Sequence, residues 1–296
     1  MFDVADQQLI AGAAATLSWQ PTDSDGEPAT PGTVTVGVTR SDGTVVIVSG
    51  TVPAGTGASP RTVALTAAQT AQLDHLTATW TSGGVVVAVT VAEVIGRPLL
   101  TFAELVDLEP RAASIALPTF LRRRREVDRL FAERTLRGFT PRFEVQRLRP
   151  GHHDRGGVID RPLVLNHPDL RRVRWARHVD TDGSVTNLTV SSVPSSPAGV
   201  AYLRDGTSWP TSGDVEIGYE YGYDRTPHDV LSAAALYLRF VAGSGTTSVP
   251  ERATSYADGA GGVTQLATPG LGPFITGIPE VDEVLTAYRW NATGIA

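Results

Sequence analysis

The sequence predicts an α+β protein of two domains, with an all-β N-terminal sandwich followed by a helical core. Short strand-like segments and Gly-rich turns fill residues 1–95. Amphipathic helical patterns begin only after residue 96. A chain of 296 residues is also long enough to bury two cores. We expect an immunoglobulin-like sandwich at 1–95, a helical core with an inserted antiparallel sheet at 96–246, and an extended C-terminal arm at 247–296.

The strand segments of the first domain are short and fairly regularly spaced, as in β-sandwiches. About seven strands would make the sandwich immunoglobulin-like. Trp19 and Trp80 are expected in its core because tryptophan buries a large apolar area. Residues 67–73 could form a single helical turn. The expected strands are 16–19, 33–40, 44–49, 61–65, 78–80 and 85–94.

Helical signals follow a linker at 95–98. Thr101 and Glu104 have the spacing of a capping box, in which each side chain bonds the other residue's backbone amide. A long helix is predicted from Pro118 to Gly138, with proline at a first position and glycine as the left-handed residue that ends it. Its apolar arc would contain Phe120, Val127, Leu130 and Phe131.

This helix carries a run of arginines, Arg122, Arg123, Arg124 and Arg125. The run is either a solvated helix face or an interface with another subunit. Pairs at i,i+4 spacing, Arg122 with Glu126 and Arg129 with Glu133, would partly neutralise it. Arg124 and Arg134 fall on the apolar side of the helical wheel. Because an unpaired buried guanidinium is costly, both are expected to have partners in the fold or on another subunit.

Two-residue alternation returns after residue 138, and a helix follows it. Asp182-Gly183 predicts a hairpin turn, and the sheet is expected to pack against the helices. A helix opening at Thr226-Pro227 and ending at Gly243 would bury Leu231–Val241 against the first long helix. The expected strands contain Phe143 and Val145, or span 158–165, 172–179, 184–190, 200–203 and 214–221.

Residues 243–279 are rich in Gly, Ser, Thr and Pro and show no helical period. Stretches of this length are uncommon inside compact domains unless they are functional. A short amphipathic helix is predicted at 279–290, with Val281, Leu285 and Tyr288 on one side. We expect this segment to be an arm that reaches a neighbouring chain.

Charge is distributed unevenly along the chain. Residues 97–178 hold 18 arginines against 10 acids, whereas 1–96 hold 2 against 8 and 179–296 hold 5 against 13. A basic middle between acidic ends fits subunits that meet basic face to acidic face, and it equally fits a surface near nucleic acid. All 25 basic residues are arginine.

No pattern of catalytic or metal-binding residues stands out. The chain has no cysteine, which excludes disulfides and thiolate chemistry. His152-His153-Asp154 lacks a third ligand at metal-site spacing, so a solvated loop is favoured over a metal site. We therefore expect no enzyme, no cofactor and no metal. The N-terminus lacks signal-peptide character, and the apolar run at 85–95 is too short for a membrane span.

From Pro98 onward the chain resembles the head-to-tail adaptor, or connector, proteins of long-tailed bacteriophages. Three stretches carry the resemblance, and the last pair is the most specific. They are Leu136-Arg-Gly-Phe139 with Thr140-Pro-Arg-Phe143; Trp209-Pro with 214–222 leading to Pro227; and 250–256 with 276–282. The resemblance implies a ring, dodecameric in the family, that attaches to the portal in the virion neck and continues the DNA channel.

The resemblance also implies where contacts would lie and what they would join. The expected partners are further copies of the chain, the portal, stopper and other neck or tail proteins, and packaged double-stranded DNA that slides without sequence specificity. The protein would be made in the host cytoplasm. A stopper or tail-terminator subunit, or a surface-binding module built on the sandwich, remains open. The expected subunit or portal interface residues are Arg122, Arg123, Arg124, Arg125, Arg134, Arg252, Tyr256, Ile278, Pro279, Val281, Leu285 and Tyr288.

Overall fold

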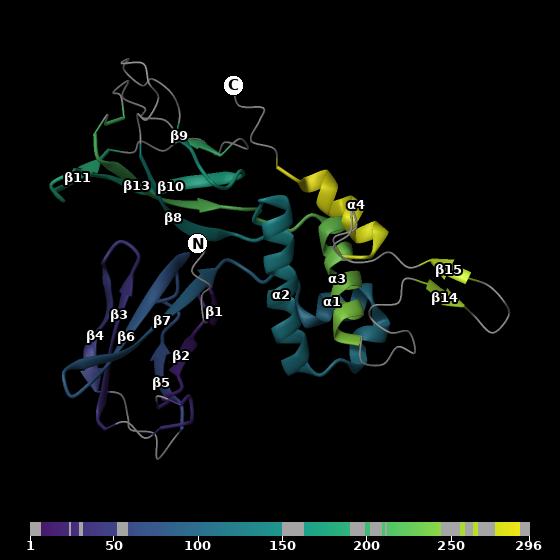
Figure 1. Ribbon diagram of the computed structural model, residues 1–296, viewed down its shortest axis with the longest axis horizontal. Coiled ribbons are helices and arrows are strands. Elements are labelled where there is room, and N and C mark those ends of the chain that lie inside the picture. The colour runs from purple at the N-terminus through teal and green to yellow at the C-terminus, as the bar shows by residue number, and fades with distance from the viewer. Residues whose placement is uncertain are drawn as a thin grey trace. The chain divides into compact units, whose positions relative to one another are not determined.

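The computed structural model contains helices and several β-sheets and divides into two compact units (Figure 1). Unit 1 comprises residues 1–97 and 141–222, and unit 2 comprises 98–140 and 223–296. Each unit is described by itself below. The structure describes residues 7–23, 25–29, 32–51, 59–149, 163–189, 199–201, 209–210, 212–243, 255–257, 263–265 and 276–290.

The N-terminal part of unit 1 contains seven strands in two sheets around one core. The larger sheet has the order β1-β7-β6-β3-β4, and β2 pairs with β5 in the smaller one. Trp80 is fully buried and lies 5.7 Å from the Trp19 ring, so both tryptophans belong to the core as predicted. The strands are β1 Gln7–Ile10, β2 Ala15–Trp19, β3 Val34–Arg40, β4 Val45–Thr51, β5 Arg61–Leu65, β6 Asp74–Ser82 and β7 Val85–Ile95.

The strands match the predicted segments closely, with β1 as an addition. The short stretch before β6 consists of hydrogen-bonded turns, and the bond from the Thr70 amide to the Thr66 carbonyl closes one helical turn close to the predicted position. β1 pairs with β7 in parallel over Ala92–Ile95, and every other pairing in this sheet is antiparallel. The immunoglobulin-like assignment stays a prediction.

The second part of unit 1 is a four-stranded antiparallel sheet with the order β11-β10-β13-β8. Gly183, at φ 86°, sits in the predicted hairpin turn between β10 and β11. A separate apolar cluster that includes Trp209 and Tyr219 packs on this sheet. The strands are β8 Arg142–Leu148, β10 Leu170–Val179, β11 Val185–Leu188 and β13 Asp214–Tyr221, with the short pair β9 Leu163–Val164 and β12 Val200–Ala201.

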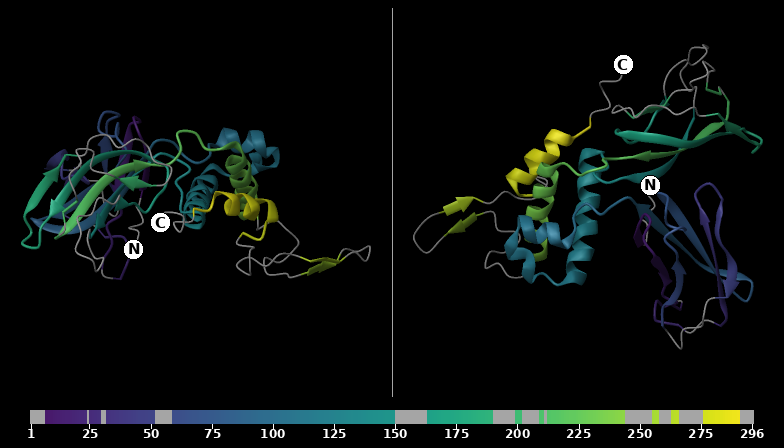
Figure 2. Two further views of the ribbon diagram at one scale, coloured as in Figure 1. Left: turned by 90° about the horizontal axis from the view of Figure 1, so that it is seen from above. Right: turned by 180° about the vertical axis from the view of Figure 1, so that it is seen from behind.

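Unit 2 is a helical core (Figure 2). Its apolar cluster joins residues of α2, α3 and α4 with Leu99, Leu100 and Phe139. The capping box of α1 is confirmed, because Thr101 accepts from the Glu104 amide and Glu104 accepts from the Thr101 amide. The helices are α1 Phe102–Leu108, η1 Pro110–Ser114, α2 Leu117–Thr135, α3 His228–Gly243 and α4 Pro279–Tyr288.

The long helix ends earlier than predicted and in a different way. Its left-handed residue is Leu136, with φ 57°, and not Gly138. The carbonyl of Thr135 accepts the amide of Trp290 at 2.8 Å, and the Thr135 hydroxyl accepts the amide of Arg137. These tertiary bonds satisfy the helix end where a glycine cap would otherwise do so.

The start of α3 also differs from the prediction. Thr226 does not cap the helix, because its hydroxyl donates to the carbonyl of Phe139. The first helical bond runs from Leu231 to the carbonyl of Pro227, so the proline lies one position earlier than predicted.

The contact pattern groups the chain differently from the predicted boundaries. The four-stranded sheet, predicted within the domain at 96–246, groups with the N-terminal strands in unit 1. The segment predicted as an extended arm includes a small hairpin, β14 Ser255–Ala257 paired with β15 Val263–Gln265 (Figure 2). It also includes α4, which packs in the core of unit 2. Long-range packing of this kind leaves no signature in local composition.

Candidate subunit interface

The inner face of α2 builds the core of unit 2, as the apolar arc predicts. Phe120, Val127 and Phe131 are buried, and Leu130 is half-buried. They pack in one cluster with Ala234 and its neighbours on α3, which confirms α3 as the partner of this arc. This packing holds the backbone of α2 in place, and with it the Cα positions of the residues on the opposite face.

Arg124 is satisfied within its own chain. Its guanidinium donates to the carbonyl of Leu100 at 3.4 Å and lies 5.5 Å from the centre of the Phe120 ring. Burial lowers the pKa of Arg124, and the charge of Asp128 one turn away opposes that shift. Asp128 is itself only 4% exposed. The predicted need for a partner is thus met inside the fold, which argues against a neighbouring subunit as that partner.

Arg134 does not lie on the buried side. It is exposed in the last turn of α2, where a positive charge is favourable near the helix C-terminus. Its expected contact with another subunit therefore stays a prediction.

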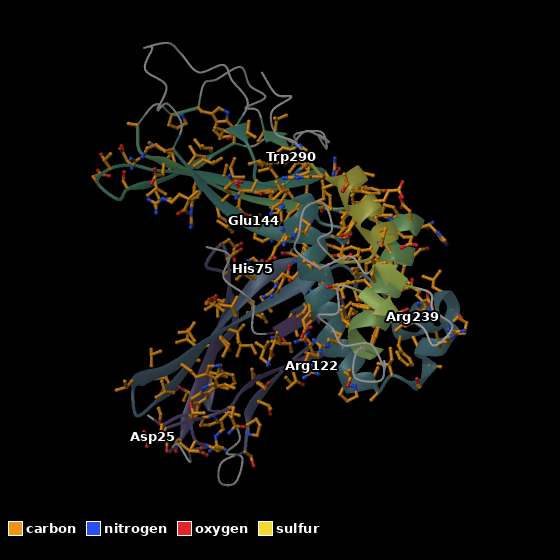
Figure 3. The ribbon with its side chains drawn as sticks, turned by 45° about the vertical axis from the view of Figure 1, so that its right-hand side comes forward. Asp25, His75, Arg122, Glu144, Arg239 and Trp290 are labelled. Carbon is orange, nitrogen blue, oxygen red and sulfur yellow. The ribbon has the colours of Figure 1, made fainter. Side chains whose placement is uncertain are left out.

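The outer side of α2 combines arginine with exposed leucine near the helix start. Leu117 is 54% exposed and Leu121 is 39% exposed. Arg122 and Arg125 are exposed as well, and within the described residues neither has a carboxylate within 4.0 Å (Figure 3). We call these four residues the outer ridge of α2. Exposed leucines beside unpaired arginines are typical of protein interfaces, which are rich in arginine and apolar at their centres.

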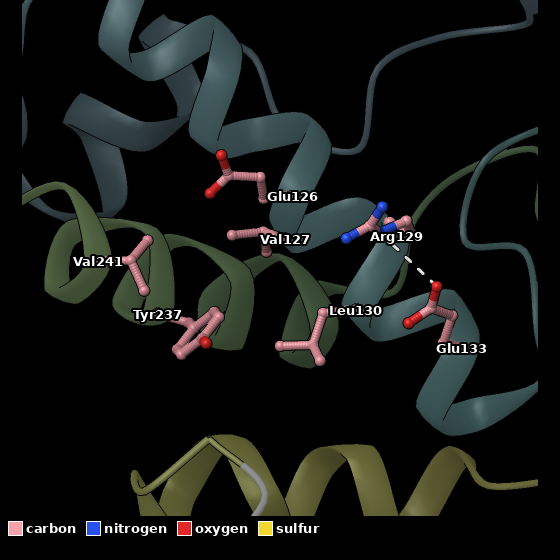
Figure 4. Close-up of a pocket in the computed structure, with 7 residues that line it drawn as sticks. All are labelled: Glu126, Val127, Arg129, Leu130, Glu133, Tyr237 and Val241. Carbon is pink, nitrogen blue, oxygen red and sulfur yellow. Dashed lines mark ion pairs between the residues drawn. The ribbon is translucent and has the colours of Figure 1, made fainter. Parts of the chain in front are cut away.

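The remaining arginines of the run pair along the helix. Arg123 bonds Glu126 at 2.7 Å, and Arg129 lies 3.6 Å from Glu133 (Figure 4). The predicted partner of Glu126 was Arg122, which is one residue off. A groove of about 260 Å³ lies between α2 and α3 beside these pairs, with Val127, Leu130, Tyr237 and Val241 among its lining residues.

The C-terminal residues predicted at an interface have mixed positions. Val281 and Leu285 are buried at 0% and 2% exposure in the core of unit 2, so they are not available at its surface. Tyr288 is half-buried, and its carbonyl accepts from Arg137 at 2.8 Å. The interface expectation for Val281 and Leu285 is corrected, because they hold α4 on its own chain, and the expectation for Tyr288 stays a prediction. Ile278 is the N-cap of α4 and packs on the core, Pro279 is exposed, Tyr256 lies in β14, and Arg252 lies outside the described residues.

The sequence analysis missed a buried anchor in unit 1. Asp74 on β6 is fully buried, and its carboxylate accepts from Arg40, Ser41 and the amide of His75. Arg174 on β10 lies 3.6 Å from Asp74 and donates to the carbonyl of Leu73. The guanidinium also lies 4.8 Å from the centre of the Phe143 ring. Arg174 therefore binds the sandwich to the four-stranded sheet, across 100 residues of sequence.

A second polar cluster lies on β8 and β13 of the same sheet. Glu144 accepts from His167 at 2.7 Å and from Tyr219 at 3.2 Å (Figure 3). Burial raises the pKa of Glu144, but the hydrogen bonds and attraction of His167, with Asn166 and Tyr219, outweigh it and leave the pKa below 4.5. Burial beside Glu144 raises the pKa of Tyr219. Tyr219 therefore stays a hydrogen-bond donor throughout the ordinary pH range.

The described residues contain no group of three or more His, Asp or Glu that could hold a metal ion. His152, His153 and Asp154 lie outside the described residues. None of the helices that the structure describes has both the length and the apolar character that a membrane crossing needs. The expectations of no enzyme activity and no cofactor stay predictions.

Comparison with solved structures gives weak likenesses, two of which are described here. No family model matches the chain, and no curated protein matches it. A chain from the "neck of empty GTA particle computed with C6 symmetry" is 18% identical, with a TM-score of 0.42 over 65% of this chain and 90% of that one. A chain from the "neck of native GTA particle computed with C12 symmetry" is 16% identical, with a TM-score of 0.39 over 63% and 88%. At these scores neither likeness carries an argument, so the proposals below stand on this chain's own residues.

Proposed function

We propose that the protein is a structural ring subunit of a virion neck, of the head-to-tail adaptor type. In this role it would attach to the portal in a ring, with twelve copies as in the family it resembles. It would continue the channel through which DNA leaves, and it would contact stopper or other tail proteins on the far side. The sandwich, in this proposal, is an immunoglobulin-like addition. No catalytic step is proposed.

The observation that carries the proposal is the outer ridge of α2. The helix is fixed by a buried inner face, while its outer ridge presents to solvent leucines and two arginines that pair with no carboxylate of the described residues. A closed ring needs two different complementary patches on each copy. The acidic residues at both ends of the chain offer a source of the second patch. The motifs at 136–143, at Trp209-Pro with 214–222 leading to Pro227, and at 250–256 with 276–282 support the adaptor type.

The same ridge could also face nucleic acid, but its composition favours protein. Contacts to phosphate come from cations and polar groups and need no exposed leucine. Leu121 lies within about one turn of Arg122 and Arg125, and Leu117 lies one turn before Leu121, so a partner that covers the arginines also covers apolar surface. A sliding duplex offers little apolar surface in exchange. DNA contact is therefore a secondary expectation, made by sequence-independent charge along the channel.

Imaging of the purified protein with and without portal tests the proposal. Particles should be rings of one symmetry, and they should stack coaxially on portal rings when the two are mixed. Monomers at every concentration, together with no binding to portal, would contradict the adaptor role. Rings that bind a tail tube but not portal would instead favour a stopper or tail terminator.

A further inference from the structure

We infer that the sandwich takes part in the ring through β-strand addition, in which β7 of one copy pairs with β4 of the next. The inference rests on the proposed ring and names a second contact within it. It starts from an unusual edge of the five-stranded sheet. β1 covers β7 only at Ala92–Ile95, and among the described residues no strand lies against the outer side of Val85–Thr90.

This edge is apolar and carries none of the usual protections. Val85, Val86, Val87 and Val89 are each between 44% and 67% exposed. The stretch Val85–Thr90 contains no charged residue and no proline. Natural edge strands are normally short, charged, interrupted by proline or covered, because an open row of backbone groups recruits another strand. An apolar edge that lacks these features is suited to a partner strand.

The opposite edge of the same sheet has matching properties. β4 is the last strand in the order, and Val45 and Val48 on it are 57% and 78% exposed. Val45–Thr51 also contains no charged residue. These two uncharged apolar edges, on opposite sides of one sheet, can form a head-to-tail contact that joins every copy to the next when a ring closes.

Strand direction fits this contact. β6 runs antiparallel to both β7 and β3, and β4 runs antiparallel to β3. β4 therefore runs opposite to β7 within one copy. Copies related by a ring axis along the strands keep these directions, so β4 of the next copy meets β7 as an antiparallel neighbour. Antiparallel pairing is the more stable of the two ladder types.

The faces of the two strands also agree. Leu76, Ala78 and Trp80 of β6 point into the core, so Thr77 and Thr79 lie on the outer face. Val89 is the cross-strand partner of Thr79. Val45 is the cross-strand partner of Thr39, which is in turn the partner of Thr77. Since cross-strand partners lie on the same face of a sheet, both valines lie on the outer face. In the joined sheet they would share one surface, where side chains of adjacent strands contact each other.

Charged substitutions at the two edges test the contact. Val89→Lys and Val45→Glu should each raise the concentration for half-assembly at least about tenfold, equivalent to ~1.4 kcal/mol. The double variant should return it towards wild type, because each lysine then meets a glutamate of the next copy. Val185→Lys is the matched control, since Val185 is 55% exposed on β11, an edge strand of the other sheet. Sedimentation and circular dichroism would report assembly and folding.

Each result decides between the possible contacts. Rings that form equally well with Val89→Lys would overturn strand addition while leaving the proposed ring intact. If a mixture of Val89→Lys and Val89→Glu chains assembles but the double variant does not, β7 pairs with β7, and the head-to-tail contact is wrong. A wild-type protein that stays monomeric at every concentration contradicts the ring itself.

Discussion

The arginines of β10 and those on the outer side of α2 differ in whether they pair with acidic residues of their own unit. On β10, Arg172, Arg174 and Arg177 each pair with an acid of their own unit, Glu220, Asp74 and Glu216 respectively. On α2, Arg122 and Arg125 are exposed, and neither has such a partner among the residues that the structure describes. A strand inside a sheet brings its side chains against neighbouring strands, whereas one face of a surface helix has only solvent opposite it. Unpaired arginine is therefore the better guide to an external partner.

The largest expected effect concerns the buried anchor on β10. Arg174→Ala should lower the free energy of unfolding by about 3 kcal/mol, because the fully buried Asp74 loses a cation. Urea unfolding would measure this. Arg172→Ala is the control in the same strand, and it should cost less than about 1 kcal/mol because the Arg172 side chain is 61% exposed. Equal costs for the two variants would mean that Arg174 is not an anchor.

A similar loss is expected where α4 closes the core behind α2. Leu285→Ala removes a side chain that is 2% exposed and should cost about 3 kcal/mol in urea unfolding. Val284→Ala, at a half-buried neighbouring position, should cost clearly less. If Leu285→Ala is harmless to folding but weakens portal binding, α4 is an arm and not part of the core.

Substitution of Arg124 should cost less unfolding free energy than the two changes above, but more than substitution of a residue of the outer ridge. Arg124→Glu would place a carboxylate beside Asp128 and Leu100's carbonyl, and should cost about 2 kcal/mol of unfolding free energy. Arg122→Glu should change that energy by less than about 0.5 kcal/mol, since its site is exposed. Thermal melts of both variants would detect the difference. Equal melting temperatures would place Arg124 with the outer ridge.

The smallest expected effect is a change in acid stability from Glu144. Its folded-state pKa lies below the ordinary 4.5, so its contribution is fully present above about pH 4.5 and is lost as pH falls through the folded value. Glu144→Gln should therefore flatten the decline of stability below pH 4.5, relative to wild type. Urea unfolding at a series of pH values would measure it. An unchanged slope would mean that Glu144 does not contribute.

The sequence predicts the elements of this fold better than it predicts their partners. The capping box at Thr101 and the hairpin at Gly183 are local, and both are confirmed. The end of α2 at Leu136 depends on Trp290, more than 150 residues away, and no local signal reports such a bond. The pairing of Arg174 with Asp74 likewise joins residues far apart in the sequence, so no local signal predicts it.

The candidate interface shows the same limit. Periodicity placed Arg122 and Arg125 outside, and the structure agrees. Periodicity also placed Arg134 inside and left Val281 and Leu285 for a neighbour. Arg134 is exposed in the last turn of α2, and the positions of Val281 and Leu285 depend on what α4 covers, which only tertiary packing decides.

The central claim, that the outer ridge of α2 joins copies into a ring, can be tested by native mass measurement. The double variant Arg122→Glu with Arg125→Glu should be a folded monomer, with the wild-type circular dichroism spectrum and at most a small change in melting temperature. Arg125→Lys, which keeps the charge, should assemble like wild type. A wild-type ring that the double variant retains in full would contradict the claim.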